Sequence, residues 1–287
     1  MRDKRVLITG ATNGIGRAAA TGLAALGASL CIVGRDATKT EQVAAQLRTQ
    51  HTTDVEVLLA DLSSQAAVHQ LADQVLERYE RLDVLVNNAG GFFETRRTTV
   101  DGFEYTFALN HLGYVTLTAR LLDLLRASTP ARIINVSSEA QATGRIQFDD
   151  LQFSRRYSGF AAYSQSKLAN VMFTYALARR LVGSGVTVNA LHPGVVRSGF
   201  GSESRNPLFR LAFQAIKQFG ISPEQGADTV IYLASNPDIA TASGQYFVRR
   251  TPKRSSALSY DQAAQERLWA LSESLTGRAA ANKSESR

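Results

Sequence analysis

Tyr163 and Lys167 stand four residues apart in the stretch "FAAYSQSKLANV" at 160–171. Four residues make about one turn of an α-helix, so both side chains would project from the same face. A phenol and an amine on one face can share a ligand and move a proton to or from it. Exposed helices often carry this spacing without any chemistry, so a catalytic interpretation requires a cofactor site elsewhere in the chain.

A candidate cofactor site lies near the N-terminus, where the apolar run "RVLITG" at 5–10 leads into "ATNGIGRAAATGLAALG" at 11–27. Gly10, Gly14 and Gly16 fall at the expected turn from a strand to a helix. Glycine there lets the backbone approach a pyrophosphate closely, and the helix N-terminus offers unpaired N–H groups and a positive dipole end. Because this strand, loop and helix begin a series of similar units, the pattern predicts a dinucleotide-binding loop.

Short apolar runs alternate with amphipathic stretches along the chain. The runs are nearly continuous in apolar residues, which is typical of strands that are buried on both faces of a parallel sheet. We therefore expect an α/β fold with one Rossmann-type, doubly wound parallel sheet of about seven strands and helices on both faces. The strands are expected at 5–10, 29–34, 55–60, 82–90, 132–138, 186–194 and 244–248, the last at the edge. The helices are expected at 14–27, 37–50, 64–80, 100–127, 160–183 and 223–235.

The composition is that of an ordinary globular protein, with 287 residues, 44% hydrophobic and 20% charged. It predicts a single domain over 1–275 and a flexible tail at 276–287. The single cysteine, Cys31, fits a reducing compartment. We expect a cytoplasmic protein, because "MRDKRVLITG" lacks a signal-peptide pattern and no apolar run reaches the about 18 residues of a membrane span.

The net charge of +7 permits a polyanionic partner. The densest basic cluster, "VRRTPKRSS" at 248–256, lacks interleaved aromatic residues, so no nucleic-acid partner is expected. A phosphorylated cofactor would account for part of the basic bias. No metal site is expected either.

The order and spacing of these motifs resemble the short-chain dehydrogenase/reductase family over about residues 4–250. The glycine loop has the spacing G-x-x-x-G-x-G, and "NNAG" at 87–90, Tyr163-x-x-x-Lys167 and "PG" at 193–194 follow in the family's order. The resemblance implies hydride transfer between a nicotinamide cofactor and a carbonyl or alcohol group. Softer motifs, "QSKLANVMFTYALARRL" at 165–181 and "VTVNALHPGVV" at 186–196, are similar to the retinol dehydrogenase-like branch.

The resemblance assigns four catalytic positions, and this chain fills all of them. Tyr163 would be the general acid/base, and Lys167 would lower its pKa from the ordinary value near ~10 and bind the cofactor ribose. Ser138, in preference to Ser137, would orient the substrate oxygen, and Asn110 would anchor a proton relay. Two histidines beside these motifs are interpreted as structural: His111 and His192.

The charge that follows the second expected strand distinguishes the two nicotinamide cofactors. Arg35 in "IVGRD" would attract the 2′-phosphate of NADP, with Arg17 as a second cation, whereas Asp36 would favour NAD. NADP(H) is therefore preferred, and NAD(H) stays an alternative. The cofactor-binding residues expected from the loop and from the resemblance are Gly10, Thr12, Asn13, Gly14, Ile15, Gly16, Arg17, Arg35, Asp61, Leu62, Asn88, Ala89, Gly90, Tyr163, Lys167, Pro193, Gly194, Val196 and Ser198.

The function that follows is an NADP-dependent oxidoreductase acting on an apolar aldehyde, ketone or secondary alcohol. Two alternatives stay open: a dinucleotide-binding regulatory protein without turnover, and an epimerase or dehydratase that uses the same Tyr–Lys pair. The apolar spacing at 204–220 favours either a substrate lid over about 198–220 or a helix packed on the domain. The resemblance also implies a homodimer or homotetramer through helices such as those at 100–127 and 160–183.

Overall fold

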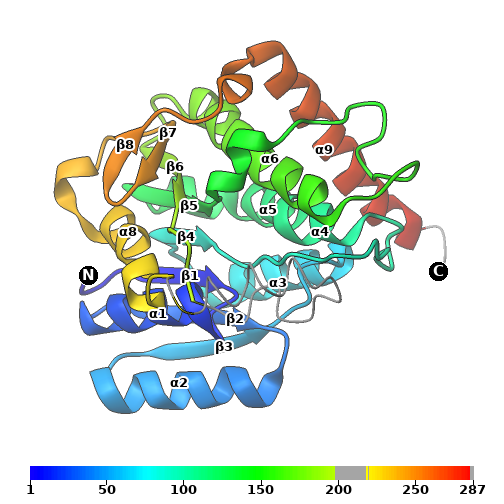
Figure 1. Cartoon of the computed structure of the whole chain (residues 1–287). Helices are drawn as coiled ribbons and strands as arrows, with labels where there is room; N and C mark the ends of the chain where they lie inside the picture. Colours follow the sequence, from blue (N-terminus) through cyan, green and yellow to red (C-terminus); the bar gives the residue numbers. More distant parts are fainter. Residues whose placement is uncertain (198–217, 219, 285–287) are drawn as a thin grey trace.

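A mostly parallel sheet with helices on both faces forms the centre of the molecule (Figure 1). The computed structural model describes residues 1–197, 218 and 220–284. In these residues, eight strands form one sheet in the order β3-β2-β1-β4-β5-β6-β7-β8. The predicted α/β, Rossmann-type doubly wound sheet is confirmed. The strands are β1 (Arg5–Thr9), β2 (Ser29–Gly34), β3 (Val55–Leu59), β4 (Val84–Asn87), β5 (Ala131–Val136), β6 (Val186–His192), β7 (Gln245–Val248) and β8 (Thr251–Lys253).

The two faces of the sheet are covered by different helices, and alternate residues of one strand enter different cores. Leu7 of β1 packs in the core with α3, α5 and α6, whereas Val6 and Ile8 pack in the core with α1, α2 and α8. A strand buried on both faces needs apolar residues at successive positions, which explains the continuous apolar runs. The helices are α1 (Gly14–Ala25), α2 (Ala37–His51), α3 (Gln65–Arg78), α5 (Gly113–Ala127), α6 (Gly159–Arg180) and α8 (Pro223–Ser235).

The strand count and the edge strand differ from the sequence prediction of about seven strands. β7 pairs in parallel with β6, but its other side pairs antiparallel with β8, so β8 forms the edge of the sheet. The prediction missed β8 because it has only three residues, all exposed, and contains Pro252 within the basic cluster. Proline and lysine are nevertheless usual on edge strands, where they discourage pairing with another chain.

The helix expected over 100–127 is divided. It begins with the short α4 (Tyr105–Phe107), continues through a π-helical turn, η1 (Ala108–Leu112), and ends as α5. Glu104 caps the start, accepting hydrogen bonds from the backbone N–H of Thr106 at 2.8 Å and of Phe107 at 2.7 Å. The π-helical turn contains Asn110. The described residues also form three short 3₁₀ helices: η2 (Glu139–Thr143), η3 (Pro237–Ile239) and η4 (Ala257–Tyr260).

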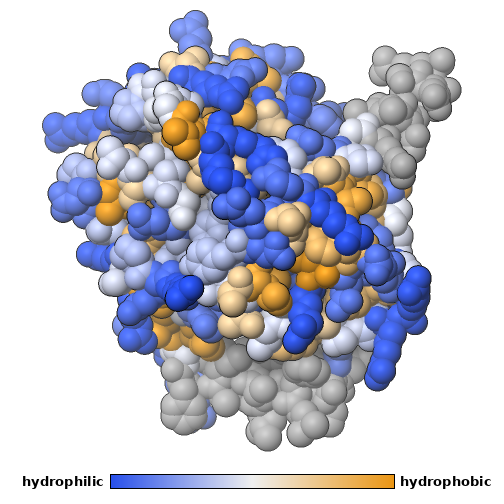
Figure 2. Space-filling model, turned by 90° about the horizontal axis from the view of Figure 1, so that it is seen from above, coloured by the Kyte–Doolittle hydropathy of each residue, from blue (hydrophilic) through white to orange (hydrophobic). Residues whose placement is uncertain are grey.

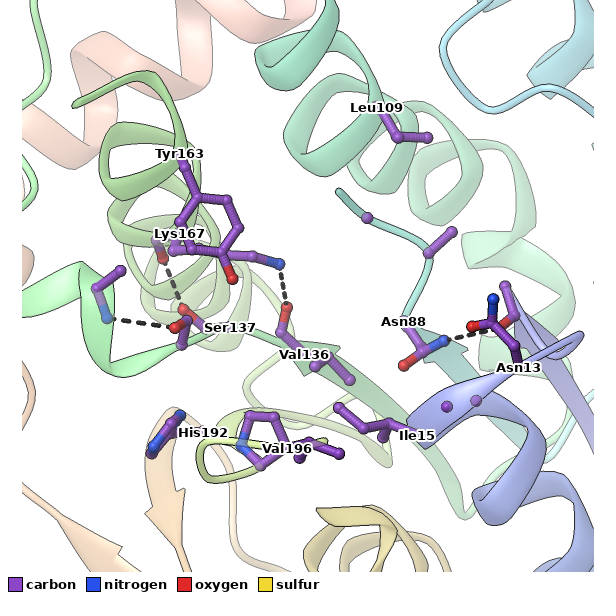
Figure 3. A pocket seen from close by; sticks show the side chains of 18 of the residues that line it. Asn13, Ile15, Asn88, Leu109, Val136, Ser137, Tyr163, Lys167, His192 and Val196 are labelled. Carbon is purple, nitrogen blue, oxygen red and sulfur yellow. Dashed lines mark hydrogen bonds between the residues drawn. The ribbon is translucent and has the colours of Figure 1, made fainter. Parts of the chain in front are cut away.

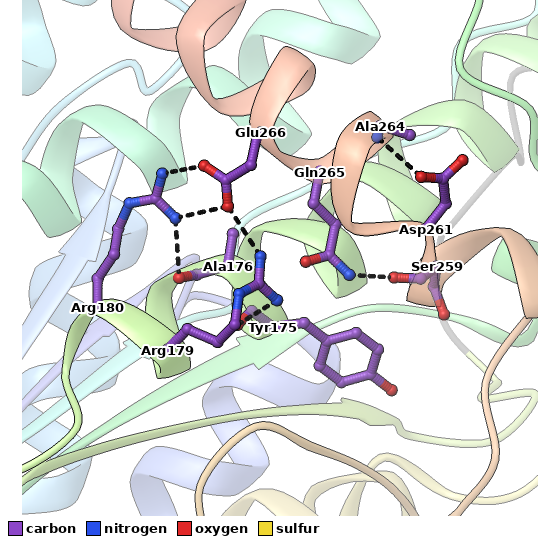
Figure 4. A network of polar contacts seen from close by, with 9 residues as sticks. All are labelled: Tyr175, Ala176, Arg179, Arg180, Ser259, Asp261, Ala264, Gln265 and Glu266. Atoms are coloured by element: carbon purple, nitrogen blue, oxygen red, sulfur yellow. Dashed lines mark hydrogen bonds and ion pairs between the residues drawn. The ribbon is translucent and has the colours of Figure 1, made fainter.

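A C-terminal helix, α9 (Gln262–Ser284), was not among the expected elements. It packs against α6, α5 and α3, with Trp269 stacked on Phe173 of α6 at a centroid distance of 5.5 Å. Figure 4 shows Glu266 of α9 paired with Arg179 and Arg180 at the end of α6. The backbone of 276–284, predicted as part of a flexible tail, lies in this helix, and its flexibility stays a prediction. No helix in the described part of the chain is long and apolar enough to cross a membrane.

Candidate active site

A cavity of about 660 Å³ opens at the carboxyl ends of the parallel strands. Residues that directly follow β1, β3, β4 and β5 line it, together with the ends of β2 and β6. The strand order reverses between β1 and β4, and open α/β sheets bind ligands at such a switch point. The predicted residues that line the cavity are Gly10, Thr12, Asn13, Gly14, Ile15, Gly16, Arg35, Leu62, Asn88, Ala89, Gly90, Ser138, Tyr163, Lys167, Pro193, Gly194 and Val196.

The glycine loop forms a close-fitting cradle at one end of this cavity. Gly10 and Gly14 have φ values of +67° and +51°, in the left-handed region that favours glycine. A Cβ on Gly16 would lie 2.2 Å from the Gly10 carbonyl oxygen and 2.5 Å from Asn88 Nδ2, so only glycine fits there. The N-cap side chain, Asn13, makes no capping hydrogen bond within the described residues. The first-turn N–H groups of α1 therefore suit an anionic ligand such as a dinucleotide pyrophosphate.

Of the three charged residues predicted to select the cofactor, one lines the cavity and two bond to helix α2. Arg35 lines the cavity, and its Nη1 donates to the Tyr105 hydroxyl at 2.9 Å. The Asp36 carboxylate accepts a hydrogen bond from the backbone N–H of Lys39 at 3.0 Å and so caps α2. Arg17 donates to Gln46 on α2 at 2.8 Å and is not among the described residues that line the cavity.

Asp61 also lies beside the cavity rather than in its lining. Its carboxylate accepts hydrogen bonds from the Ser63 backbone N–H at 3.0 Å and from the Ser63 hydroxyl at 2.7 Å. It stands 4.0 Å from Arg35 Nη1, so the two residues form a loose ion pair at the cavity edge. Leu62, the next residue, is the one of this predicted pair that lines the cavity.

Tyr163 and Lys167 lie one turn apart on α6, as their spacing predicts, and point into the cavity (Figure 3). Lys167 Nζ donates to the Val136 carbonyl oxygen at 3.1 Å and lies 5.6 Å from the centroid of the Tyr163 ring. Burial raises the pKa of Tyr163 to about 12, which a hydrogen bond with Ser138 partly opposes, and it lowers the pKa of Lys167 to about 7. The tyrosine pKa therefore moves opposite to the expected direction, because desolvation exceeds the effect of its polar neighbours.

The two adjacent serines after β5 have different partners. The Ser137 hydroxyl is buried and donates to the Lys167 carbonyl oxygen at 2.8 Å, which fixes α6 against the sheet. The Ser138 hydroxyl accepts a weak hydrogen bond from the Ala140 N–H at 3.3 Å and also bonds with Tyr163. The structure thus places Ser138, rather than Ser137, beside the phenol.

Asn110 lies behind the cavity wall, in the π-helical turn. Its side-chain amide donates to the Gly91 carbonyl oxygen and to Ser166 Oγ, each at 3.0 Å, and accepts from the Gly91 N–H at 2.8 Å. A Cβ added to Gly90 would lie 3.0 Å from Asn110 Oδ1 and 3.5 Å from Lys167 Nζ. Gly90 therefore separates these two groups, and its lack of a side chain leaves both close to the cavity.

The predicted residue Ser198 and nearly all of the predicted lid at 198–220 lie outside the described residues. Gly194, with φ of +95°, makes the turn that brings Pro193 and Val196 to the cavity. Several lining residues were not predicted, among them Leu109, Thr143, Phe160, His192 and Val195. Phe160 could have been found from its position, because it precedes Tyr163 by three residues and shares its helix face.

Two of the additional lining residues are titratable, Glu139 and His192. His192 Nδ1 accepts a hydrogen bond from the Glu139 backbone N–H at 3.1 Å, so Nε2 carries the proton of the neutral ring. Burial lowers the pKa of His192. The sequence interpretation of this histidine as structural did not anticipate that it lines the cavity.

Comparison with known proteins identifies the class of enzyme. The family model for short chain dehydrogenase matches residues 4–208. Retinol dehydrogenase 14 of Mus musculus is 42% identical over 290 residues, which cover 96% of this chain and 87% of that protein. The chain belongs to the short-chain dehydrogenase/reductase family, whose members are NAD(P)-dependent oxidoreductases acting on CH–OH and C=O groups. Within the family it is similar to retinol dehydrogenases.

Solved structures support the same assignment. The crystal structure of an uncharacterized protein from Mycobacterium paratuberculosis has a TM-score of 0.77 and 35% identity, covering 96% of this chain and 94% of that one. The Pseudomonas aeruginosa RhlG/NADP active-site complex has a TM-score of 0.67 and 32% identity, covering 86% of this chain and 94% of that one. That related structure contains NADP in its active site.

Proposed function

We propose that this protein is an NADP-dependent oxidoreductase that reduces an apolar aldehyde or ketone, or oxidises the corresponding alcohol, with Tyr163 as the general acid/base. The observation that carries the proposal is the arrangement of Tyr163 and Lys167 on one wall of the cavity, across from Asn13 and Ile15 of the glycine loop (Figure 3), with Ser138 bonded to the phenol. A dinucleotide held in that cradle would extend along the carboxyl ends of the strands toward these three side chains.

The chemistry follows from the hydrogen bonds of these side chains. The bound cofactor supplies or accepts the hydride at the substrate carbon. During reduction Tyr163 would give its proton to the carbonyl oxygen and be left as the phenolate; during oxidation the phenolate would take the alcohol proton, so the hydride and the proton both balance. Because burial raises its pKa to about 12, Tyr163 is protonated at neutral pH and ready to act as the acid. Ser138, bonded to the phenol, is placed to orient the same substrate oxygen.

The preference for NADP is supported by Arg35 and by the position of the competing carboxylate. Arg35 is at the cavity and its side chain is 61% exposed, so it can turn toward a phosphate. Asp36, which would favour NAD, is engaged in capping α2. The related Pseudomonas aeruginosa structure contains NADP, which agrees with this preference.

An apolar substrate is supported by the side chains at the cavity mouth. Phe160 and Val195 line the cavity and are 47% and 55% exposed, so both offer apolar surface that a ligand in the cavity would cover. The similar proteins that are named for retinol act on a long apolar alcohol by that name. A long apolar aldehyde or alcohol is therefore the substrate class that we propose for this chain.

The test is the substitution Tyr163→Phe, measured as NADPH consumption with a panel of short and long aldehydes and ketones. We expect turnover to fall at least about 100-fold while NADPH binding, measured by titration, stays unchanged, since only the transferable proton is removed. The matched control is Tyr175→Phe, which removes a tyrosine hydroxyl from the same helix. This hydroxyl bonds Ser255 at 2.6 Å, and Tyr175 is not among the described residues that line the cavity. Near-normal turnover in folded Tyr163→Phe, or no NADPH consumption by the wild type with any substrate, would refute the proposal.

A further inference from the structure

Four buried residues form a line of hydrogen bonds from α9 to the π-helical turn that contains Asn110. Ser272 Oγ lies 2.9 Å from His111 Nε2, His111 Nδ1 lies 3.1 Å from Asn170 Oδ1, and Asn170 Nδ2 donates to the Asn110 carbonyl oxygen at 2.9 Å. All four residues are at most 2% exposed. Buried polar groups destabilise a fold unless they are hydrogen-bonded, so such an uninterrupted line implies a specific arrangement.

The donors and acceptors give this line one direction. Because the Asn170 amide nitrogen donates to the Asn110 carbonyl, the Asn170 oxygen faces His111, and His111 Nδ1 must carry a hydrogen. Burial lowers the pKa of His111 to about 4, so the ring is neutral at pH 7 and Nε2 is an acceptor. The Ser272 hydroxyl has one hydrogen and two acceptors within reach, the Leu268 carbonyl oxygen at 2.8 Å and His111 Nε2 at 2.9 Å. The Nδ1–H tautomer of His111 requires this hydroxyl to turn its hydrogen from Leu268 to Nε2.

The line ends beside the catalytic groups. Asn110 holds both backbone groups of Gly91 and the Ser166 hydroxyl with its side chain, while its carbonyl accepts from Asn170. Gly91 continues the loop that lines the cavity, and Ser166 precedes Lys167 on α6. A displacement of the Asn110 peptide would therefore shift the cavity wall and the surroundings of Lys167 together.

We propose that His111 is a positioning residue: supported at Nε2 by Ser272 of α9, its Nδ1–H holds the Asn170 oxygen, so that the Asn170 amide stays on the Asn110 carbonyl and Asn110 keeps its place at the active site. The docking of α9 thereby becomes part of the active-site geometry. The inference rests on the proposed function only in so far as Asn110, Tyr163 and Lys167 form the catalytic site. If the four residues merely filled the core, their substitution would lower stability without a selective effect on turnover.

The first test compares two substitutions of His111. Asparagine can present an N–H near the position of Nδ1, whereas leucine cannot. We expect His111→Leu to lower kcat about 10- to 100-fold with KM for NADPH within about twofold of wild type, since small displacements of catalytic groups are costly. We expect His111→Asn to recover most of kcat. Equal losses in the two variants, or losses that follow the melting temperature alone, would overturn the proposal.

The second test separates the line from the general docking of α9. Ser272→Ala removes the last donor of the line, whereas Glu266→Gln weakens the contact of α9 with Arg179 and Arg180 outside it (Figure 4). We expect Ser272→Ala to lower kcat several-fold and Glu266→Gln to leave kcat unchanged. A comparable loss of kcat in both variants would show that the line has no specific role.

The third test does not depend on turnover. In protein with ¹⁵N-labelled histidine, the ring resonances should show His111 as the neutral Nδ1–H tautomer, in contrast to His192, whose Nδ1 accepts a hydrogen bond. The signal is assigned by its loss in His111→Asn. Observation of an Nε2–H tautomer for His111 would overturn the proposed direction of the line, whatever the result for Tyr163→Phe.

Discussion

Lys167 and Tyr163 share a buried wall, and burial shifts their pKa values in opposite directions. Desolvation favours the neutral form of each group, so the pKa of the amine falls to about 7 and that of the phenol rises to about 12. Lys167 nevertheless keeps only a carbonyl acceptor, Val136, within hydrogen-bond distance among the described residues. Protonation of the buried Lys167 amine therefore costs free energy in the folded protein, and such destabilised groups are common at functional sites.

This cost gives a prediction for the stability of the protein without cofactor. The folded pKa of Lys167, about 7, lies below the ordinary lysine value of 10.5, so the unfolded chain binds more protons between these pH values. The wild type should therefore gain stability relative to Lys167→Met as pH rises from 7 toward 10, by up to about 1.4 kcal/mol per pH unit. Urea unfolding of both proteins at pH 7, 8 and 9 measures this, and parallel pH profiles would contradict it.

Arg35 and Arg17 give a matched pair for cofactor selection. Arg35→Asp should raise KM for NADPH about 10- to 100-fold and affect KM for NADH far less, because a charged hydrogen bond to phosphate contributes about 1.5–3 kcal/mol. Arg17→Asp makes the same charge change at a residue that bonds Gln46, so its effect should be small. Equal effects of the two substitutions, or a wild type that prefers NADH in a binding titration, would refute the assignment of Arg35.

The sequence predicted many residues of the site, because motif spacing determines which residues follow each strand. It placed Tyr163 and Lys167 on one helix face, and the family resemblance preferred Ser138 to Ser137 as the orienting residue, a role that stays a prediction. It could not show that Arg17 turns to α2 or that Asp36 caps that helix, because side-chain partners depend on tertiary packing. The cavity position of His192 was missed for the same reason.

At the scale of elements, long buried strands and helices were predicted better than short or peripheral ones. Continuous apolar runs located β1 to β6, since a sheet covered on both faces requires such runs, and the amphipathic stretches between them located most helices. The π-helical turn η1 has no sequence signal of this kind, because it depends on hydrogen bonds from Asn170 and Gly91. α9 did carry a signal, with Leu268, Leu271 and Leu275 spaced to pack on one side.

The docking of α9 on α6 gives a prediction with a defined pH dependence. Hydrogen bonds from Arg180 and Arg179 lower the pKa of Glu266 to about 2. The stabilisation is therefore complete above the ordinary glutamate pKa of 4.5 and is lost as pH falls toward 2. Because the pair is half exposed, Glu266→Gln should cost at most about 1 kcal/mol at pH 7, less in high salt and less below pH 4.5. Urea unfolding at pH 7 and 4 checks this, and a difference that grows on acidification would contradict it.

At the scale of the whole molecule, the sheet separates two apolar cores, and α9 adds a third cluster with α6 and the π-helical turn. As a result α6 is buried around most of its circumference within one chain. On the face seen in Figure 2, hydrophobic side chains form separate groups bordered by hydrophilic ones. The apolar residues of α6, a helix through which the resemblance implies subunit contacts, have partners within the same chain.

This arrangement bears on the assembly that the family resemblance implies. Among the described residues of α5 and α6, Phe160 is the one large hydrophobic side chain that is well exposed, and it lines the cavity. A homodimer through these helices would have to displace α9, with the loss of the Trp269–Phe173 stack and the Glu266 ion pairs. We therefore expect the full chain to be a monomer of 31.1 kDa by light scattering at micromolar concentration.

A variant that uncovers the helices provides the matched comparison for this last prediction. Trp269→Ser removes the ring that covers Phe173, so part of the apolar surface of α6 becomes available. We expect its mass to rise with concentration while that of the wild type stays constant. If the wild type instead has two or four times the monomer mass, packing of α9 on α6 does not prevent association, and the monomer prediction is wrong. If both proteins stay monomeric, the exposed surface of α6 does not drive association, and the homodimer or homotetramer that the resemblance implies does not form at micromolar concentration.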